Sequence, residues 1–462
     1  MKKIIKYLAS LKLAVFIIIS ISILTAVGTI IESRFDAYAA KKIVYDTFWM
    51  YSIMGMLVVN LIAVIVDRYP WKQRHLAFIF AHVGIIILLF GGLLTMKYGL
   101  DGSLRIGIGE KARYVQTAET DIVVYSSFDG DSYSKTFEAE VDFFNHPPSV
   151  EKPYRIPTMK NEIQIIDYKK YVIPSRKVIE SQRTNAGVGV RLQIQNKNAN
   201  SIEWIVQNQD GKQAKQSFGP LTVYLGNLPA HGQLQNEIHL MPSKNGVELE
   251  YVLFGKENLK PIKKGKVSEG GVIQTPWMNS EVRILRLLAR AEEQWDIQEL
   301  TRPTPLTVAA VQVLHEDRKQ WVLLNDMLKV FTENAAYLMT FGNRRIDLGF
   351  DVQLNKFDID RYQGTMRAMS YRSVVTVPGL SDVEISMNEP MKYKKLTFYQ
   401  ASFQEDEMGR PIASILSVNQ DPGRFFKYLG SLIMSLGIIF LFYFKRMDFI
   451  NFYKKGKSHD NN

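Results

Sequence analysis

Four long apolar stretches stand out in a chain of 462 residues whose remaining sequence is mixed and polar. They cover residues 13–31, 47–66, 76–96 and 428–444, and none of them contains Asp, Glu, Lys or Arg. Each has about the length at which an α-helix crosses the hydrocarbon core of a bilayer, which takes roughly 20 residues. The pattern predicts four transmembrane helices, three of them within residues 1–96 and the fourth close to the C-terminus.

Region 97–427 has a different pattern, in which apolar and polar residues alternate over short runs. In "GVGVRLQIQN" the apolar residues recur at every second position, which is the period of a half-buried strand. Turn signals such as "NHPP", "VPG" and "DPG" separate the runs. We expect an antiparallel sandwich or barrel, as one domain or two subdomains, interrupted by helices at "EVRILRLLARAEEQWDIQEL" and "LNDMLKVFTENAAYL". The predicted fold class is a membrane protein with four transmembrane α-helices plus a large mainly-β extracytoplasmic domain.

Basic residues are concentrated in the flanks on one side of the apolar stretches. The positive-inside rule assigns that side to the cytoplasm, so both termini, including a basic tail at 445–462, are expected there. These flanks account for most of the formal net charge of +11, so the charge indicates topology and gives little support for nucleic-acid binding. The first apolar run is long for a signal peptide and lacks a clear cleavage site, so we expect it to remain as a span. The basic flanks comprise Lys2, Lys3, Lys6, Lys12, Arg68, Lys72, Arg74, Lys445, Arg446, Lys454, Lys455 and Lys457.

The sequence offers little catalytic chemistry. It contains no cysteine, which excludes disulfides, thiol redox chemistry and thiolate ligands in this chain. Region 97–427 has no hydrolase, metalloprotease, nucleotide-binding or calcium-binding motif. Its histidines are far apart in sequence, and we expect them to be exposed or hydrogen-bonded rather than metal ligands. We therefore do not expect an enzyme in this chain alone. The histidines are His146, His231, His239 and His315.

His82 is the exception, because it lies inside the third apolar stretch. At about 1.5 Å per residue it is roughly 9 Å below the cytoplasmic edge, where an ionisable side chain is costly and indicates function. A neutral imidazole there can bind iron or relay a proton. Alternatively, His82 bonds Asn60 or Thr25 of a neighbouring helix. His75, at the boundary, is expected to be an interface residue. On a helix, the face of His82 also carries Phe78, Ile85, Leu89, Gly92 and Met96.

Aromatic residues lie at the expected ends of the spans, where Trp and Tyr usually form the interfacial belt. They could also contact the faces of a large planar anionic ligand, whose carboxylates would then meet Arg68, Arg74 or Arg105. The belt is the simpler interpretation. These aromatic residues are Trp49, Tyr69, Trp71 and Tyr98.

Several segments, taken in order, resemble the ResB family of system II cytochrome c biogenesis. Near the N-terminus they are "LASLKLAVFIIISISILTAVGTI", "FWMYSIMGMLVVNLIAVIVDRYPW", "FIFAHVGIIILLFGG" and "GSLRIGIGE". Near the C-terminus they are "YQGTMRAMSYRSVVTV", "MNEPMKYKKLTFYQASF" and "SVNQDPGRFFKYLGSLIMSLGIIFLFYF". The resemblance covers both ends of the chain, whereas residues 169–340 add little to it.

The resemblance implies a multi-pass subunit of the bacterial cytoplasmic (inner) membrane that works with a ResC/CcsA-type partner. Together they would bring haem b across the membrane and attach it to the CxxCH thiols of apocytochrome c, as a holocytochrome c synthase complex. The haem would be held transiently and shared with the partner. In that family a histidine of the third span is implicated as an axial ligand of the haem iron, and His82 is in the matching place. Because this chain has no cysteine, separate thiol-reducing proteins would have to reduce the apocytochrome.

Two other functions are compatible with the residues alone. His82 could be the relay of an ion or proton transporter, although the four apolar stretches contain no second histidine or charged residue to continue the relay. Alternatively, the chain could be a structural scaffold for a membrane partner, with His82 as an interhelical hydrogen-bonding group.

Overall fold

The computed structural model describes residues 2–129, 132–158, 163–181, 186–197, 200–207, 213–226, 235–243, 248–256, 260–331, 335–406 and 409–459. Among these, the side chains of Arg74 and of residues 444–459 lie outside the description. The chain divides into two compact units. Unit 1 comprises residues 1–147 and 324–462, and unit 2 comprises residues 148–323. Unit 2 is therefore an insertion in the sequence of unit 1.

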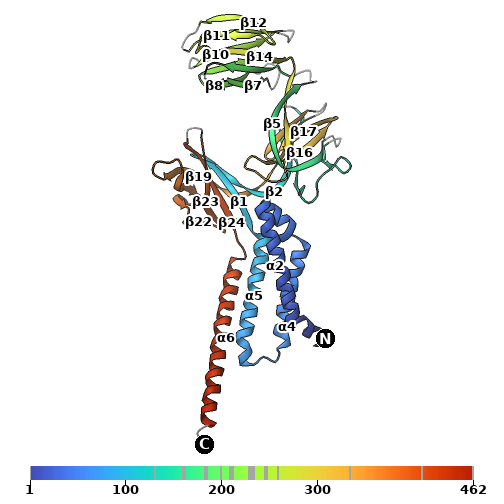
Figure 1. Ribbon diagram of the computed structural model, residues 1–462, viewed down its shortest axis with the longest axis vertical. Coiled ribbons are helices and arrows are strands. Elements are labelled where there is room, and N and C mark those ends of the chain that lie inside the picture. The colour runs from blue at the N-terminus through green and yellow to red at the C-terminus, as the bar shows by residue number, and fades with distance from the viewer. Residues whose placement is uncertain are drawn as a thin grey trace. The chain divides into compact units, whose positions relative to one another are not determined.

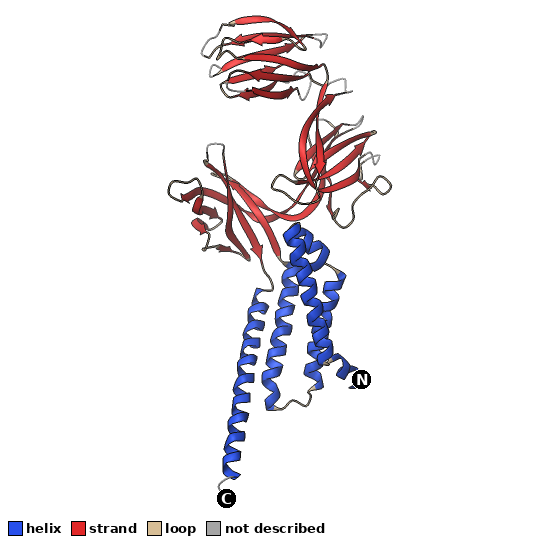
Figure 2. Ribbon diagram, viewed as in Figure 1, coloured by secondary structure: helices blue, strands red, loops and turns tan. Residues whose placement is uncertain are grey.

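All the described helices belong to unit 1, and the described residues between the third and fourth long helices form strands and loops (Figure 2). Four helical segments are long and apolar enough to cross a membrane, as predicted. Side-chain oxygens of Ser10 and Thr47 cap two of them by accepting bonds from Leu13 N and Met50 N. The helices are α1 (Lys2–Leu8), α2 (Leu11–Arg34), α3 (Ala37–Ala40), the π-helical turn η1 (Lys41–Tyr45), α4 (Phe48–Asp67), α5 (Gln73–Tyr98) and α6 (Arg424–His459).

Glycines bring α5 and α6 into close contact, side by side (Figure 1). A Cβ atom added at Gly84 would lie 2.4 Å from the backbone nitrogen of Met434, and one at Gly430 would lie 2.5 Å from that of Leu88. Small residues permit such backbone approach between membrane helices. The glycines of each helix are seven residues apart, which keeps them on one face of that helix. The set comprises Gly84 and Gly91 on α5 and Gly423, Gly430 and Gly437 on α6.

The strands of unit 1 form a ten-stranded sheet in the order β21-β20-β19-β2-β1-β24-β23-β22, with β18 on β19 and β3 on β2. Its core face is apolar and includes Leu104, Val352, Phe398 and Leu416. Because β1 continues directly from α5 and β24 leads into α6, the sheet joins two adjacent membrane helices. The strands are β1 (Leu100–Gly107), β2 (Lys111–Ser127), β3 (Ser134–Val141), β18 (Asp326–Phe331), β19 (Ala336–Arg361), β20 (Ala368–Val377), β21 (Leu380–Ser386), β22 (Met391–Tyr393), β23 (Leu396–Glu405) and β24 (Pro411–Gln420).

Unit 2 combines a β-sandwich with a small closed sheet. The sheets β12-β11-β10-β9-β8 and β13-β14-β6-β7 share one apolar core. In the other sheet, β15-β17-β16-β5-β4, the long strand β5 pairs with both β16 and β15 and closes the ring. The strands are β4 (Tyr154–Arg155), β5 (Gln164–Glu180), β6 (Gly189–Gln195), β7 (Asn200–Val206), β8 (Ala214–Phe218), β9 (Leu221–Leu225), β10 (Asn236–Pro242), β11 (Glu248–Phe254), β12 (Lys263–Ser268), β13 (Val272–Gln274), β14 (Glu281–Leu288), β15 (Ala291–Glu299), β16 (Val308–His315) and β17 (Arg318–Leu323).

The fold class is confirmed in its two parts, four apolar helices and a large mainly-β region, but three local predictions are wrong. The pairing of β9 with β10 is parallel, so the strands are not all antiparallel. "EVRILRLLARAEEQWDIQEL" forms β14 and β15 instead of a helix. A register shift between Ile284 and Arg286 interrupts the alternation of apolar and polar residues in β14, so the sequence pattern resembled that of a helix. "LNDMLKVFTENAAYL" likewise supplies β18 and the start of β19.

Candidate functional site

His82 lies on α5 and is partly buried. Its Nδ1 is 2.9 Å from the backbone oxygen of Phe78, one turn earlier on the same helix. The imidazole also packs against the Phe78 ring, with 3.7 Å between centroids. The ring is therefore held in one orientation by its own helix.

This hydrogen bond also fixes which nitrogen is available. A carbonyl oxygen only accepts, so Nδ1 must carry the proton, and in the neutral imidazole Nε2 then keeps its lone pair. None of the described side chains forms a hydrogen bond to Nε2. Metal-binding histidines commonly have this arrangement, in which the second ring nitrogen donates to a carbonyl and orients the ligand. The His82 imidazole thus fits an axial ligand of iron.

The interhelical partners considered for His82 bond elsewhere. The Asn60 side chain donates to Leu8 O at 2.6 Å, and the Thr25 hydroxyl donates to Ile21 O at 3.0 Å. The hypothesis that either residue holds His82 as interhelical glue is therefore wrong.

The three arginines proposed for a planar anionic ligand have different surroundings. The Arg68 guanidinium carbon lies 3.3 Å from the centroid of the Phe78 ring, which in turn packs on His82. Arg105, on β1, donates from Nε to Gln404 Oε1 at 2.7 Å. The Arg74 side chain is outside the described residues. Among these, Arg68 is the cation that the structure places beside the His82 site.

The interface residues lie at helix ends. Nδ1 of His75 is 3.4 Å from Lys72 N at the start of α5, consistent with an interface position. The predicted belt aromatics are exposed, and Trp71 donates from its indole nitrogen to Ile65 O at 3.0 Å.

The scattered histidines of the β region gather into no metal site within the described residues. His146 is exposed, and Nε2 of His315 is 3.7 Å from Glu316 Oε1. His239 is buried, with Nε2 at 2.8 Å from Glu237 Oε2 and its ring stacked on Tyr224. His231 is outside the described residues.

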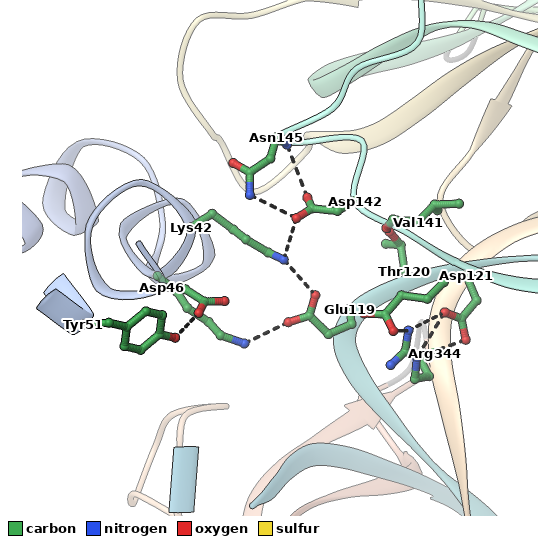
Figure 3. A network of polar contacts seen from close by, with 12 residues as sticks. Lys42, Asp46, Tyr51, Glu119, Thr120, Asp121, Val141, Asp142, Asn145 and Arg344 are labelled. Carbon is green, nitrogen blue, oxygen red and sulfur yellow. Dashed lines mark hydrogen bonds and ion pairs between the residues drawn. The ribbon is translucent and has the colours of Figure 1, made fainter. Parts of the chain in front are cut away.

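An ion-pair network around the buried Lys42 attaches the segment between α2 and α4 to the ten-stranded sheet (Figure 3). This network was not predicted from the sequence. Lys42 Nζ lies 3.0 Å from Asp142 Oδ2 and 3.2 Å from Glu119 Oε2, and only 9% of its side chain is exposed. Lys41, at 52% exposed, also pairs with Glu119. The adjacent lysines between two apolar stretches were the sequence signal for this network.

The pKa values of this network follow from its charges. Burial alone would lower the pKa of Lys42, but hydrogen bonds to Asp142 and Glu119 raise it above the ordinary value. Burial alone would raise the pKa of Glu119 and Asp142, but the lysines hold both below the ordinary value. The lowered carboxyl pKa values stabilise the fold above about pH 5, and the raised lysine pKa does so below about pH 10. Acidification through the folded-state carboxyl pKa values removes this stabilisation.

Lys42→Met is expected to destabilise unit 1 by about 3 kcal/mol, because it leaves two partly buried carboxylates without their shared cation. Thermal unfolding in detergent at neutral pH measures the loss. Lys41→Met is the matched control and should cost less than about 1 kcal/mol, because Lys41 is exposed. Acidification to below about pH 4, through the lowered pKa values of Glu119 and Asp142, should reduce the difference in unfolding free energy between Lys42→Met and the unaltered protein. Equal effects of the two substitutions would contradict the assignment.

Comparison with known proteins agrees with the resemblance seen in the sequence. A model of the ResB-like family matches residues 331–413, which run from the end of β18 into β24. This chain is similar to the ResB-like family. It is 23% identical over 441 residues to Protein NrfI of Wolinella succinogenes, an alignment that covers 94% of this chain and 34% of the relative. The chain thus spans about a third of the length of the curated relative it matches.

The matched segment lies in the ten-stranded sheet, not around His82. It supports the predicted role in cytochrome c maturation. The match does not bear on His82, whose suitability as a ligand is argued only from its geometry on α5.

Proposed function

We propose that this chain is a haem-handling subunit of a system II cytochrome c maturation complex in the bacterial cytoplasmic membrane. Its ResC/CcsA-type partner supplies the second axial ligand, and the two chains bring haem b to the extracytoplasmic side for attachment to CxxCH of apocytochrome c. Both termini are cytoplasmic, and the β region lies outside. The family resemblance and the four apolar helices support this proposal.

The observation that carries the proposal is the His82 imidazole, which presents an unbonded Nε2 from within an apolar helix. Haem supplies the iron, which binds such a nitrogen when a second ligand completes its coordination. His82 provides the lone pair, and the Phe78 carbonyl holds the ring and its tautomer. Arg68 packs against the Phe78 ring, which in turn packs on His82, and provides a cation for a haem propionate.

The remaining parts of the chain position other molecules. With no cysteine, the chain forms no thioether and reduces no disulfide, so its contribution to attachment is to bring haem and the apocytochrome thiols together. The β region is suited to hold the partner and the apocytochrome. Separate thiol-reducing proteins supply the reduced CxxCH.

The test is reconstitution of cytochrome assembly in a bacterial host that lacks its own maturation genes. The chain, its ResC/CcsA-type partner and a reporter cytochrome are co-expressed, and covalent haem is detected by peroxidase staining of denaturing gels. We expect stained reporter only when both membrane proteins are present. A reporter whose CxxCH cysteines are replaced by serine should remain unstained.

Omission of this chain distinguishes a maturation subunit from a transporter. Staining that is unchanged without the chain would contradict the proposal. Proton or ion flux that depends on His82 in vesicles containing this chain alone would favour the transporter instead.

A further inference from the structure

A polar cavity of about 670 Å³ lies in unit 1 where the ten-stranded sheet meets the first turns of α6. Its walls come from β1, β22, β23, β24 and α6. Ser417 and Asn419 of β24 line it, whereas the alternate residues Leu416 and Val418 belong to the apolar core. Because successive side chains of a strand point to opposite faces, the cavity lies on the face of the sheet away from its core.

The cavity lies at the start of the fourth candidate membrane span. Asp421, just before α6, accepts a hydrogen bond from Thr95 near the end of α5, so the last turn of one span meets the first turn of the next here. Tyr428 lines the cavity from α6 and is 72% exposed. One turn further along α6, Leu432 is 58% exposed and lies within the fourth apolar helical segment. A ligand held here therefore has an apolar helix surface directly beside it.

Three cationic and two carboxylate side chains line the cavity, namely Lys392, Arg424, Lys427, Asp101 and Asp421. The ion pairs of Asp421 leave hydrogen-bond donors of Lys392 and Arg424 available. Asp421 pairs with Lys427 at 2.7 Å, whereas its distance to Arg424 Nε is 3.9 Å, which is beyond hydrogen-bonding range. Burial alone would raise the pKa of Asp421, but Lys427, Thr95 and Arg424 hold it below the ordinary value, so Asp421 keeps Lys427 engaged. Lys392 is exposed and forms no ion pair with a described residue.

We propose that this cavity binds the phosphate of an anionic membrane phospholipid, through Lys392 and Arg424, with the acyl chains along Tyr428 and Leu432 of α6. Arginine and lysine form strong charge-assisted hydrogen bonds to phosphate. The combination of spare cations, an exposed tyrosine and an adjoining apolar helix matches an amphiphile with a charged head. The lipid stabilises the junction between the sheet and α6.

The test uses the full chain, purified in detergent, delipidated and incubated with phosphatidylglycerol or phosphatidylcholine. Bound lipid is counted by native mass spectrometry. Phosphatidylglycerol is expected to be retained preferentially. Replacement of both Lys392 and Arg424 by alanine should weaken its retention about tenfold or more, because both charge-assisted hydrogen bonds to the phosphate are lost. Thermal unfolding of each variant without lipid checks that it folds.

The matched control is Lys111→Ala with Lys395→Ala, which removes two exposed cations of unit 1 outside the cavity. It should retain phosphatidylglycerol like the unaltered chain. Equal loss in the control, or equal binding of phosphatidylcholine, would overturn the proposal. Displacement of the lipid by millimolar inorganic phosphate would also overturn it, because the site would then recognise free phosphate.

Discussion

Replacement of His82 by alanine is expected to lower the haem that co-purifies with the complex of this chain and its ResC/CcsA-type partner by about tenfold or more. The substitution removes the one imidazole that α5 holds inside its apolar stretch, with Nε2 unbonded. Loss of one axial ligand that contributes at least about 1.4 kcal/mol produces a tenfold change in affinity. Haem is measured by the pyridine haemochrome assay, relative to the amount of partner recovered.

His75→Ala is the matched control, because it removes the other histidine of the same helix. His75 lies in the first turn of α5, so its loss should leave haem content unchanged. Similar losses in both variants would show that a general defect of α5 is responsible. Normal haem content in His82→Ala would contradict the ligand assignment, and recovery of the partner in each preparation excludes simple dissociation.

Gly430→Leu is expected to separate α6 from α5 and to destabilise unit 1 by about 3 kcal/mol or more. Even a bare Cβ at this position would approach Gly84 O to 2.6 Å and Leu88 N to 2.5 Å. These are backbone atoms, so relief requires the helices to move apart and give up their packing. Thermal unfolding in detergent, followed by far-ultraviolet circular dichroism, measures the effect.

Gly92→Leu is the control for this prediction. Gly92 is also within α5, but a Cβ there meets nothing within 4 Å, so the substitution should change stability by less than about 1 kcal/mol. If both variants melted like the unaltered chain, close packing of α5 on α6 would be contradicted.

The membrane helices could be predicted from the sequence because the bilayer imposes a strong constraint on length and composition. The same constraint singled out His82, since a histidine is unusual in such a solvent. Its hydrogen bond to the Phe78 carbonyl could not be predicted. The bond depends on the side-chain rotamer, whereas the sequence suggested polar partners on other helices.

The parts that escaped prediction depend on contacts between distant residues. The spacing of Gly84 and Gly91 on α5 and of Gly430 and Gly437 on α6 was visible, but their contact joins segments more than 300 residues apart. The Lys42 network likewise needs Glu119 of β2 and Asp142, directly after β3, to meet a lysine about 80 to 100 residues earlier in the chain. In β14, one register shift was enough to make a strand look like a helix. Local periodicity does not reveal such bulges.

The central claim is that His82 Nε2 binds haem iron, and chemical rescue tests it most directly. The complex is prepared with His82→Gly, supplied with isotope-labelled imidazole, and examined by absorption and pulsed electron paramagnetic resonance. The account predicts that added imidazole restores the low-spin spectrum of the unaltered complex and that the labelled nitrogen couples to the iron. A low-spin spectrum that persists in His82→Gly without imidazole, or a restored spectrum without coupling to the label, would contradict it.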